Sequence, residues 1–188
     1  SNHVALQFEL PMGLAAGAGS VQIPADNPLT RAKIELGRQL YFDKRLSSDD
    51  TISCADCHHP DEGFARHTQF GVGVDGQEGG RNSPVNYNRI LSGAQFWDGR
   101  AKDVEEQAKG PILNPIEMAM PDEASVVAVL KSIPGYSPLF KAAFPNEKDP
   151  VTYENMAIAI GAFERRLVTP GRFDRFMEGD PKALTQEE

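Results

Sequence analysis

The segment Cys54-Ala55-Asp56-Cys57-His58 is the most informative part of this sequence, because two thiols three positions apart are followed directly by an imidazole. Two such thiols can each add to a vinyl group of a haem, which places the adjacent histidine beneath the iron as its proximal ligand. A haem attached in this way offers a large flat apolar surface around which a loop-rich chain can organise a core. The segment therefore predicts one covalently bound haem c, held by Cys54 and Cys57, with His58 on the iron.

The same C-x-x-C spacing also occurs in redox-active cysteine pairs and in halves of zinc sites. A redox pair normally follows a strand in a βαβ unit, and alternating strand patterns are nearly absent from this sequence. A zinc site would need two more ligands, for which the remaining histidines are His3, His59 and His67. The residues favour haem attachment and leave both alternatives open.

The composition limits the possible classes of protein. The 188 residues are 40% hydrophobic and 24% charged, which is ordinary globular usage and excludes a fully disordered chain. No apolar run of about 18 residues occurs, so no membrane span is expected. The net charge of −8, without a basic stripe, argues against nucleic-acid binding. The high content of Gly (17) and Pro (14) predicts long, ordered loops between short elements.

Hydrophobic periodicity indicates helices throughout and predicts an all-α domain. The longest helix is expected to be capped by Thr152, to bury one face, and to end at Pro170. Gly110-Pro111 is expected to stop a short helix, and Ser137-Pro138 to open another with Pro138 at its first position. The expected helices cover about 30–42, 103–109, the segment with Val126, Val129, Leu130 and Ile133, then 137–144 and 152–170.

Residues 60–88 show little periodicity and contain six glycines. The run Gly71-Val-Gly73-Val-Asp-Gly76 matches G-x-G-x-x-G, but no buried strand precedes it, so a dinucleotide site is rejected. A glycine-rich loop of this length is more typical of backbone passing close to a flat ligand. His67 on this loop could reach the iron from the other side, although such a histidine is more often solvated, and His59 is a weaker candidate.

The only tryptophan, Trp97, is most often a core residue by type, and beside a redox centre it could form part of an electron path. Gln107 and Glu117 could equally lie on a solvated helix face and in a loop, and their spacing proves no role. A peroxidase needs a polar group, ideally a carboxylate, on the open face of its haem to move a proton between the two peroxide oxygens.

Four stretches carry a specific resemblance in addition to C-x-x-C-H. They are Arg81-Asn-Ser-Pro84, Gln95-Phe-Trp-Asp-Gly-Arg100, Glu106-Gln-Ala-Lys-Gly-Pro-Ile112 and Asn114-Pro-Ile-Glu-Met118. In this order and spacing the chain resembles the bacterial di-haem cytochrome c peroxidases, a group that includes the MauG-like di-haem enzymes. The resemblance runs from about Asn27 to the end of the chain.

The resemblance implies a periplasmic enzyme that reduces hydrogen peroxide to water with electrons from a small cytochrome c or cupredoxin. It implies that residues 27–183 form the N-terminal, peroxidatic haem domain with an all-α, cytochrome c-like fold, and that full-length members are homodimers. By position, Cys54 and Cys57 bind the haem, and His58 is the proximal iron ligand. Gln107 and Glu117 would be the distal catalytic pair, Trp97 would lie between two haems, and Asn82 would help to bind a calcium ion.

Residues outside 27–183 are expected to be peripheral. Residues 1–26 are expected to form a flexible segment. Residues 184–188 are expected to begin a helix capped by Thr185, with Glu188 three residues on. The resemblance implies that this helix would open a C-terminal electron-transfer haem domain absent from the chain.

The chain departs from the family pattern at Val74, where many members place a histidine that caps the iron of the resting enzyme. Valine cannot bind iron, so we expect an open iron site beside an apolar residue. Two other functions remain as alternatives. One is a MauG-like enzyme that oxidises another protein, and the other is an electron carrier with Met118 or Met120 as a second axial ligand.

Overall fold

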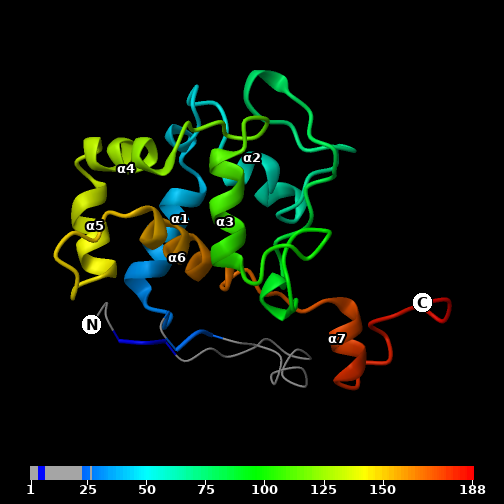
Figure 1. Cartoon of the computed structure of the whole chain (residues 1–188). Helices are drawn as coiled ribbons and strands as arrows, with labels where there is room; N and C mark the ends of the chain where they lie inside the picture. Colours follow the sequence, from blue (N-terminus) through cyan, green and yellow to red (C-terminus); the bar gives the residue numbers. More distant parts are fainter. Residues whose placement is uncertain (1–3, 7–22, 26) are drawn as a thin grey trace.

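The structure, a computed structural model, describes residues 4–6, 23–25 and 27–188, and its regular elements are helices (Figure 1). Within these residues no strand is found beyond isolated bridges, so the predicted all-α class is confirmed. Most of the expected flexible segment 1–26 lies outside the described residues. The α-helices are α1 Arg31–Tyr41, α2 Cys54–Cys57, α3 Val104–Leu113, α4 Glu123–Ser132, α5 Tyr136–Ala143, α6 Tyr153–Glu164 and α7 Arg172–Met177. Single 3-10 turns are η2 Lys44–Leu46, η3 Pro60–Glu62, η4 Val74–Gly76 and η5 Arg89–Leu91.

The centre of the fold is the crossing of α1 and α6, which also contacts α3 (Figure 1). Both central helices begin at threonine caps: Thr30 accepts a hydrogen bond from the Lys33 amide at 3.2 Å, and Thr152 accepts one from the Asn155 amide at 3.0 Å. The cap predicted at Thr152 is therefore confirmed. At Gly37 a Cβ atom would lie 1.8 Å from the Ala159 carbonyl oxygen, so only glycine lets the two helices approach this closely.

The expected stop at Gly110-Pro111 is wrong, because α3 continues to Leu113. The chain that follows turns back and donates hydrogen bonds to the last carbonyls of the helix. Met118 donates to the Pro111 oxygen at 3.2 Å, and Met120 donates to the Ile112 oxygen at 2.9 Å. Ile112 is also fully buried. These contacts offset the cost of a proline inside a helix, about 3 kcal/mol.

Three other expected helix ends also shift. Helix α5 begins at Tyr136, so Pro138 occupies its third position and not its first. Helix α6 ends at Glu164, well before Pro170, although Leu167 beyond it is still buried. No helix forms over 184–188; the Glu188 carboxylate accepts a hydrogen bond from the Thr185 amide at 2.9 Å, which is half of the expected capping arrangement.

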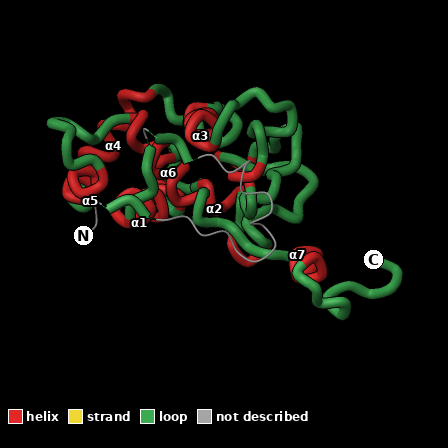
Figure 2. The backbone as a smooth tube through the Cα atoms, turned by 90° about the horizontal axis from the view of Figure 1, so that it is seen from below, coloured by secondary structure: helices red, strands yellow, loops and turns green. Residues whose placement is uncertain are grey.

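The long loops gather on one side of the helices, and α7 stands apart from the other helices in both views (Figures 1 and 2). Short α2 lies on the loop side, so the two cysteines face the boundary between the helices and the loops. In the part of the chain that the structure describes, none of the helices has the length and apolar character needed to cross a membrane.

Candidate functional site

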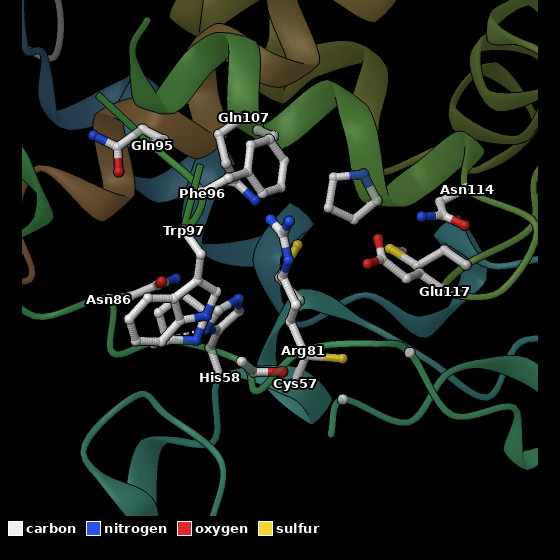
Figure 3. A pocket seen from close by; sticks show the side chains of 18 of the residues that line it. Cys57, His58, Arg81, Asn86, Gln95, Phe96, Trp97, Gln107, Asn114 and Glu117 are labelled. Atoms are coloured by element: carbon white, nitrogen blue, oxygen red, sulfur yellow. Dashed lines mark hydrogen bonds between the residues drawn. The ribbon is translucent and has the colours of Figure 1, made fainter. Parts of the chain in front are cut away.

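A cavity of about 420 Å³ opens between α2, α3, α6 and the loop side of the molecule. Its wall contains Cys54, Cys57 and His58 of the C-x-x-C-H segment, together with Gln107 of α3 and Glu117 from the loop after α3. Figure 3 shows Cys57 and His58 on one side of the cavity, with Gln107 and Glu117 across from them. The volume lies within the range of pockets that hold cofactors.

Helix α2 presents its cysteines through a short, tightly capped turn. The Asp56 carboxylate accepts hydrogen bonds from the Ser53 amide at 2.8 Å and from the Ser53 hydroxyl at 2.7 Å. The His58 amide donates to the Cys54 carbonyl oxygen at 2.9 Å, which closes the turn. Both thiols are free, and no disulfide joins them. Two unpaired thiols and an imidazole therefore line one cavity.

The His58 ring is held in the orientation that an iron ligand needs. Its Nδ1 atom lies 2.8 Å from the Pro84 carbonyl oxygen. Burial lowers the pKa of His58 to about 4, so the ring is neutral at pH 7. In the neutral ring Nδ1–H donates to Pro84, and the lone pair of Nε2 is left for a metal.

Glu117 reaches the cavity because the chain after α3 turns back on itself. The Glu117 amide donates to the Asn114 carbonyl oxygen at 3.0 Å, and its own carbonyl oxygen accepts from the Val74 amide at 2.9 Å. Burial raises the pKa of Glu117, while the positive charge of Arg100 opposes the rise. The site thus holds a carboxyl group whose proton is exchanged at a higher pH than usual.

Gly73 allows the glycine-rich loop to lie directly against this turn. A Cβ atom at position 73 would lie 2.0 Å from the Ile116 carbonyl oxygen and 2.5 Å from that of Glu117. The expectation that glycine brings this backbone close to a partner is met here by the Glu117 segment. Gly71, Gly79 and Gly80 of the same loop line the cavity itself.

Neither Val74 nor His67 lines the cavity. Val74 is 3% exposed and is not among the residues that line the cavity, so the apolar residue expected beside an open iron site lies outside the cavity wall. The His67 side chain is 75% exposed, and its Nδ1 atom lies 2.7 Å from Glu62 Oε2. Neither His67 nor His59 lines the cavity. Met118 does line it, whereas Met120 is buried elsewhere in the core.

Trp97 forms part of the rim of the cavity (Figure 3). It is 65% exposed, so the interpretation as a core residue is wrong. Its Nε1–H donates to the Asn82 carbonyl oxygen at 2.9 Å. The exposed edge of the indole therefore offers a contact at the entrance to the site.

Asn82, whose carbonyl oxygen accepts the hydrogen bond from Trp97, also binds the glycine-rich loop through its side chain. Its side-chain nitrogen donates to the carbonyl oxygens of Arg66 at 3.1 Å and Thr68 at 2.7 Å. Among the residues described, no group of three or more His, Cys, Asp or Glu side chains is placed to hold a metal ion. The calcium role of Asn82 stays a prediction.

Arg81 and Arg100 were not singled out from the sequence as site residues, although both stand in stretches that carry the resemblance. Each guanidinium lies 2.9 Å from an oxygen of Asp98, and both residues line the cavity. They bring positive charge to the mouth of the site, which suits an anionic group on a bound cofactor.

Asn86 and Glu164 were also missed. The Asn86 side-chain nitrogen donates to Tyr41 Oη at 2.8 Å and to Glu164 Oε1 at 3.0 Å, and both Asn86 and Glu164 line the cavity. The available signal for Glu164 was an acidic residue directly after the apolar run Met156–Phe163 of one helix. Acidic residues are almost never fully buried unless they are paired, so this position alone did not reveal that Glu164 lines the cavity.

The lining residues fit a c-type haem. Two free thiols can form the thioether bonds, a neutral histidine with its Nδ1 engaged can bind the iron, and two arginines can meet the propionates. The glycines of the loop side leave room for a flat group near the backbone.

The sequence pattern of the di-haem cytochrome c peroxidase family matches residues 31–182. The chain belongs to this family. A di-haem cytochrome c peroxidase is a c-type haem protein, so membership agrees with the fit of the cavity residues. The resemblance predicted from the motifs is confirmed.

Known members show how much of a di-haem cytochrome c peroxidase this chain represents. Cytochrome c551 peroxidase of Pseudomonas aeruginosa is 46% identical over 162 residues, which are 86% of this chain and 46% of that protein. The methylamine utilization protein MauG of Methylorubrum extorquens is 41% identical over 166 residues, which are 88% of this chain and 46% of that protein. The chain spans about half the length of the curated relatives it matches.

A solved structure agrees with the fold of this di-haem peroxidase family member. The crystal structure of a MauG-like protein associated with microbial copper homeostasis has a TM-score of 0.81 and 29% sequence identity. The match covers 99% of this chain and 52% of that one. The arrangement of helices and loops described above is thus shared along nearly the whole chain.

Proposed function

We propose that this chain is the peroxidatic haem domain of a di-haem cytochrome c peroxidase, which reduces hydrogen peroxide to water. The observation that carries the proposal is the placement of Glu117 and Gln107 in the same cavity as Cys54, Cys57 and His58. A haem bound there would supply an iron centre that accepts electrons and binds peroxide. The chain's own residues hold that group, and they supply the proton transfers.

Each side of the cavity has its own task in this proposal. Cys54 and Cys57 form thioether bonds, and His58 binds the iron through Nε2 because Nδ1–H is engaged by Pro84. On the other side the Glu117 carboxylate takes a proton from one peroxide oxygen and returns it to the other. Gln107 orients the peroxide by hydrogen bonding. Two electrons and two protons convert each hydrogen peroxide into two water molecules.

The electron supply lies outside this chain. We propose a small cytochrome c or cupredoxin as donor, a second haem domain C-terminal to this one as the route, and Trp97 as the contact between the haems. The exposure of Trp97 at the cavity rim supports such a contact. We further propose a periplasmic location, because haem c is attached outside the bacterial cytoplasm, a calcium ion at Asn82 between the domains, and a homodimer of the whole protein.

Mass spectrometry and a peroxide assay test this function. The purified chain should carry the mass of one haem, and Cys54→Ala with Cys57→Ala should abolish the adduct. The haem protein with an artificial electron donor should consume hydrogen peroxide with two electrons per molecule. A chain without covalent haem, or a haem protein inert to peroxide, would rule the function out.

The second candidate is an enzyme that oxidises another protein, as a MauG-like member would. The 41% identity to one such protein supports it, and so does a cavity wall whose only histidine among the described residues is His58, because such a member can dispense with a distal histidine. Measuring whether peroxide turnover proceeds with small redox donors alone separates the two candidates. Rapid turnover with such donors supports the peroxidase.

A further inference from the structure

Glu164, the last residue of α6, is a buried carboxyl group in the cavity wall that has no part in the function proposed above. It is 7% exposed and lines the same cavity as the cysteines. Its Oε1 atom accepts a hydrogen bond from the Asn86 side chain at 3.0 Å. Its Oε2 atom has no hydrogen-bond partner among the described residues. One oxygen is therefore fixed, and the other is open to a proton.

The cation that follows Glu164 in the chain is bonded to a different carboxylate. Arg165 follows it in the chain but is engaged by Glu105 of α3, with the Arg165 Nη2 atom 2.8 Å from Glu105 Oε2 and a second, parallel contact between the same two groups. Gly161 makes room for this pair, because a Cβ atom there would lie 2.9 Å from Glu105 Cδ. Arg165 is therefore paired with the Glu105 carboxylate and not with Glu164.

The groups that face Glu164 come from five elements. They are Tyr41 of α1, Cys54 of α2, Glu105 of α3, Arg165 next to α6 and Arg89 of η5. Burial and then the negative charge of Glu105 raise the pKa of Glu164 to about 8, while Arg165 and Arg89 oppose the rise. Glu164 thus exchanges its proton near neutral to alkaline pH, where a change of charge in the cavity can shift the balance.

We propose that Glu164 is a redox-linked proton site: it binds a proton when the haem of this cavity is reduced and releases it when the haem is oxidised. The proposal rests on the proposed function, because it needs a haem in the cavity. In each step a one-electron donor reduces ferric iron to ferrous iron, and one proton from solvent binds a Glu164 carboxylate oxygen. In the reverse step the iron gives up the electron and Glu164 releases the proton to solvent, so charge and atoms balance.

The physical reason is the low dielectric of the cavity wall, in which charges interact strongly. The positive charge of the ferric centre favours the ionised carboxylate of Glu164. Once an electron cancels that charge, the carboxylate is left buried and without a paired cation, so its proton affinity rises. The protonated group also gives Oε2 a hydrogen to donate.

Redox titration of the haem protein as a function of pH tests the proposal. The midpoint potential of the wild type should fall as the pH rises through the neutral and alkaline range. Glu164→Gln, which copies the protonated form, should match the wild type at acid pH and hold a higher potential at alkaline pH. Glu123→Gln, an exposed acid at the start of α4, is the matched control and should follow the wild type. Equal pH slopes in wild type and Glu164→Gln would overturn the proposal.

Infrared difference spectra of the reduced and oxidised forms give a second readout that does not depend on activity. Reduction of the wild type should produce a carbonyl band of a protonated carboxyl group that shifts in heavy water. The band should persist in Glu117→Gln and vanish in Glu164→Gln. If Glu164→Gln binds no haem, the other two proteins decide: a band missing from the wild type, or lost in Glu117→Gln, contradicts the proposal.

These outcomes are separate from those of the proposed function. A chain without covalent haem, or one that does not react with peroxide, would fail at the level of function. A haem protein that reacts with peroxide but shows the same pH slope with and without the Glu164 carboxyl would refute the proton site alone.

Discussion

The residues on the two sides of the cavity differ in how they hold protons, and that difference suits the chemistry proposed for each. His58 is neutral because burial disfavours its charged form, and its Nδ1–H is engaged by Pro84. Glu117 is half-buried, with a pKa above its usual value. One side thus offers a lone pair, and the other offers a group that can accept and return a proton.

Replacing the Glu117 carboxyl with an amide should slow the reaction with peroxide. General acid–base catalysis contributes about 10²–10⁴-fold, so Glu117→Gln should lower the rate constant by a factor in that range. Stopped-flow absorption measures this rate constant directly. Glu123→Gln should leave the rate unchanged, and a wild-type rate in Glu117→Gln would exclude the proton-transfer role.

The rate constant with peroxide should also depend on pH through Glu117. The ionised carboxylate is the form that accepts a proton from peroxide, so the rate should rise as the pH passes the pKa of Glu117. Because burial raises that pKa, the rise should lie above the range of an ordinary glutamate. The pH profile of Glu117→Gln should lack this step, and an identical step in the variant would assign it to another group.

At this scale the sequence allowed only part of the site to be predicted. Cys54, Cys57 and His58 are contiguous, so a single motif carries their chemistry. Gln107 and Glu117 came only from the resemblance, because the turn that brings Glu117 back depends on contacts with a distant loop. Glu164 was missed because its burial depends on how α6 packs against other elements, which its neighbours in the sequence do not reveal.

At the scale of elements, glycines set how closely two segments approach, and each close approach places something functional. The crossing of α1 and α6 requires Gly37, and the contact of the loop with the Glu117 turn requires Gly73. The periodicity of apolar residues predicted α1, α4 and the start of α6 well. It could not predict that α3 passes through Pro111, because the stabilising donors come from residues downstream of the helix.

Gly37→Ala should destabilise the protein although alanine is the better helix former. The added methyl group would lie 1.8 Å from the Ala159 carbonyl oxygen, so the helices must separate. Overpacking of this kind costs about 1–3 kcal/mol, which exceeds the gain in helix propensity of about 1 kcal/mol. Denaturant unfolding measures the difference. Gly135→Ala, where a Cβ atom meets nothing within 4 Å, is the control.

Gly73→Ala should impair the reaction with peroxide while leaving haem attachment intact. The new methyl group must push the Glu117 backbone away, which moves the carboxyl relative to the peroxide. The pH step assigned to Glu117 should shift along with the rate. Gly93→Ala, where a Cβ atom meets nothing within 4 Å and which does not line the cavity, is the control and should behave as the wild type. An unchanged rate and pH step in Gly73→Ala would separate the loop from catalysis.

At the scale of the whole molecule, the loops form one wall of the cavity and the helices form the other. Among the described residues, His58 is the only histidine in that wall, because His67 points outward to Glu62. The oxidised haem protein should therefore give a high-spin ferric signal in electron paramagnetic resonance and react with peroxide without prior reduction. A low-spin signal would contradict this and would point to Met118, whose side chain lines the cavity.

The contacts that fix the glycine-rich loop at position 74 have a consequence for how such sites evolve. The loop is fixed there through the Val74 amide and the bare α-carbon of Gly73, and the Gln77 side chain donates to the carbonyl oxygens of Val74 and Pro115, each at 3.3 Å. None of these contacts uses a side-chain atom of position 74. A lineage could therefore change the residue at position 74 while these contacts keep the Glu117 turn in place, so the loop residue and the catalytic turn beneath it can be inherited separately.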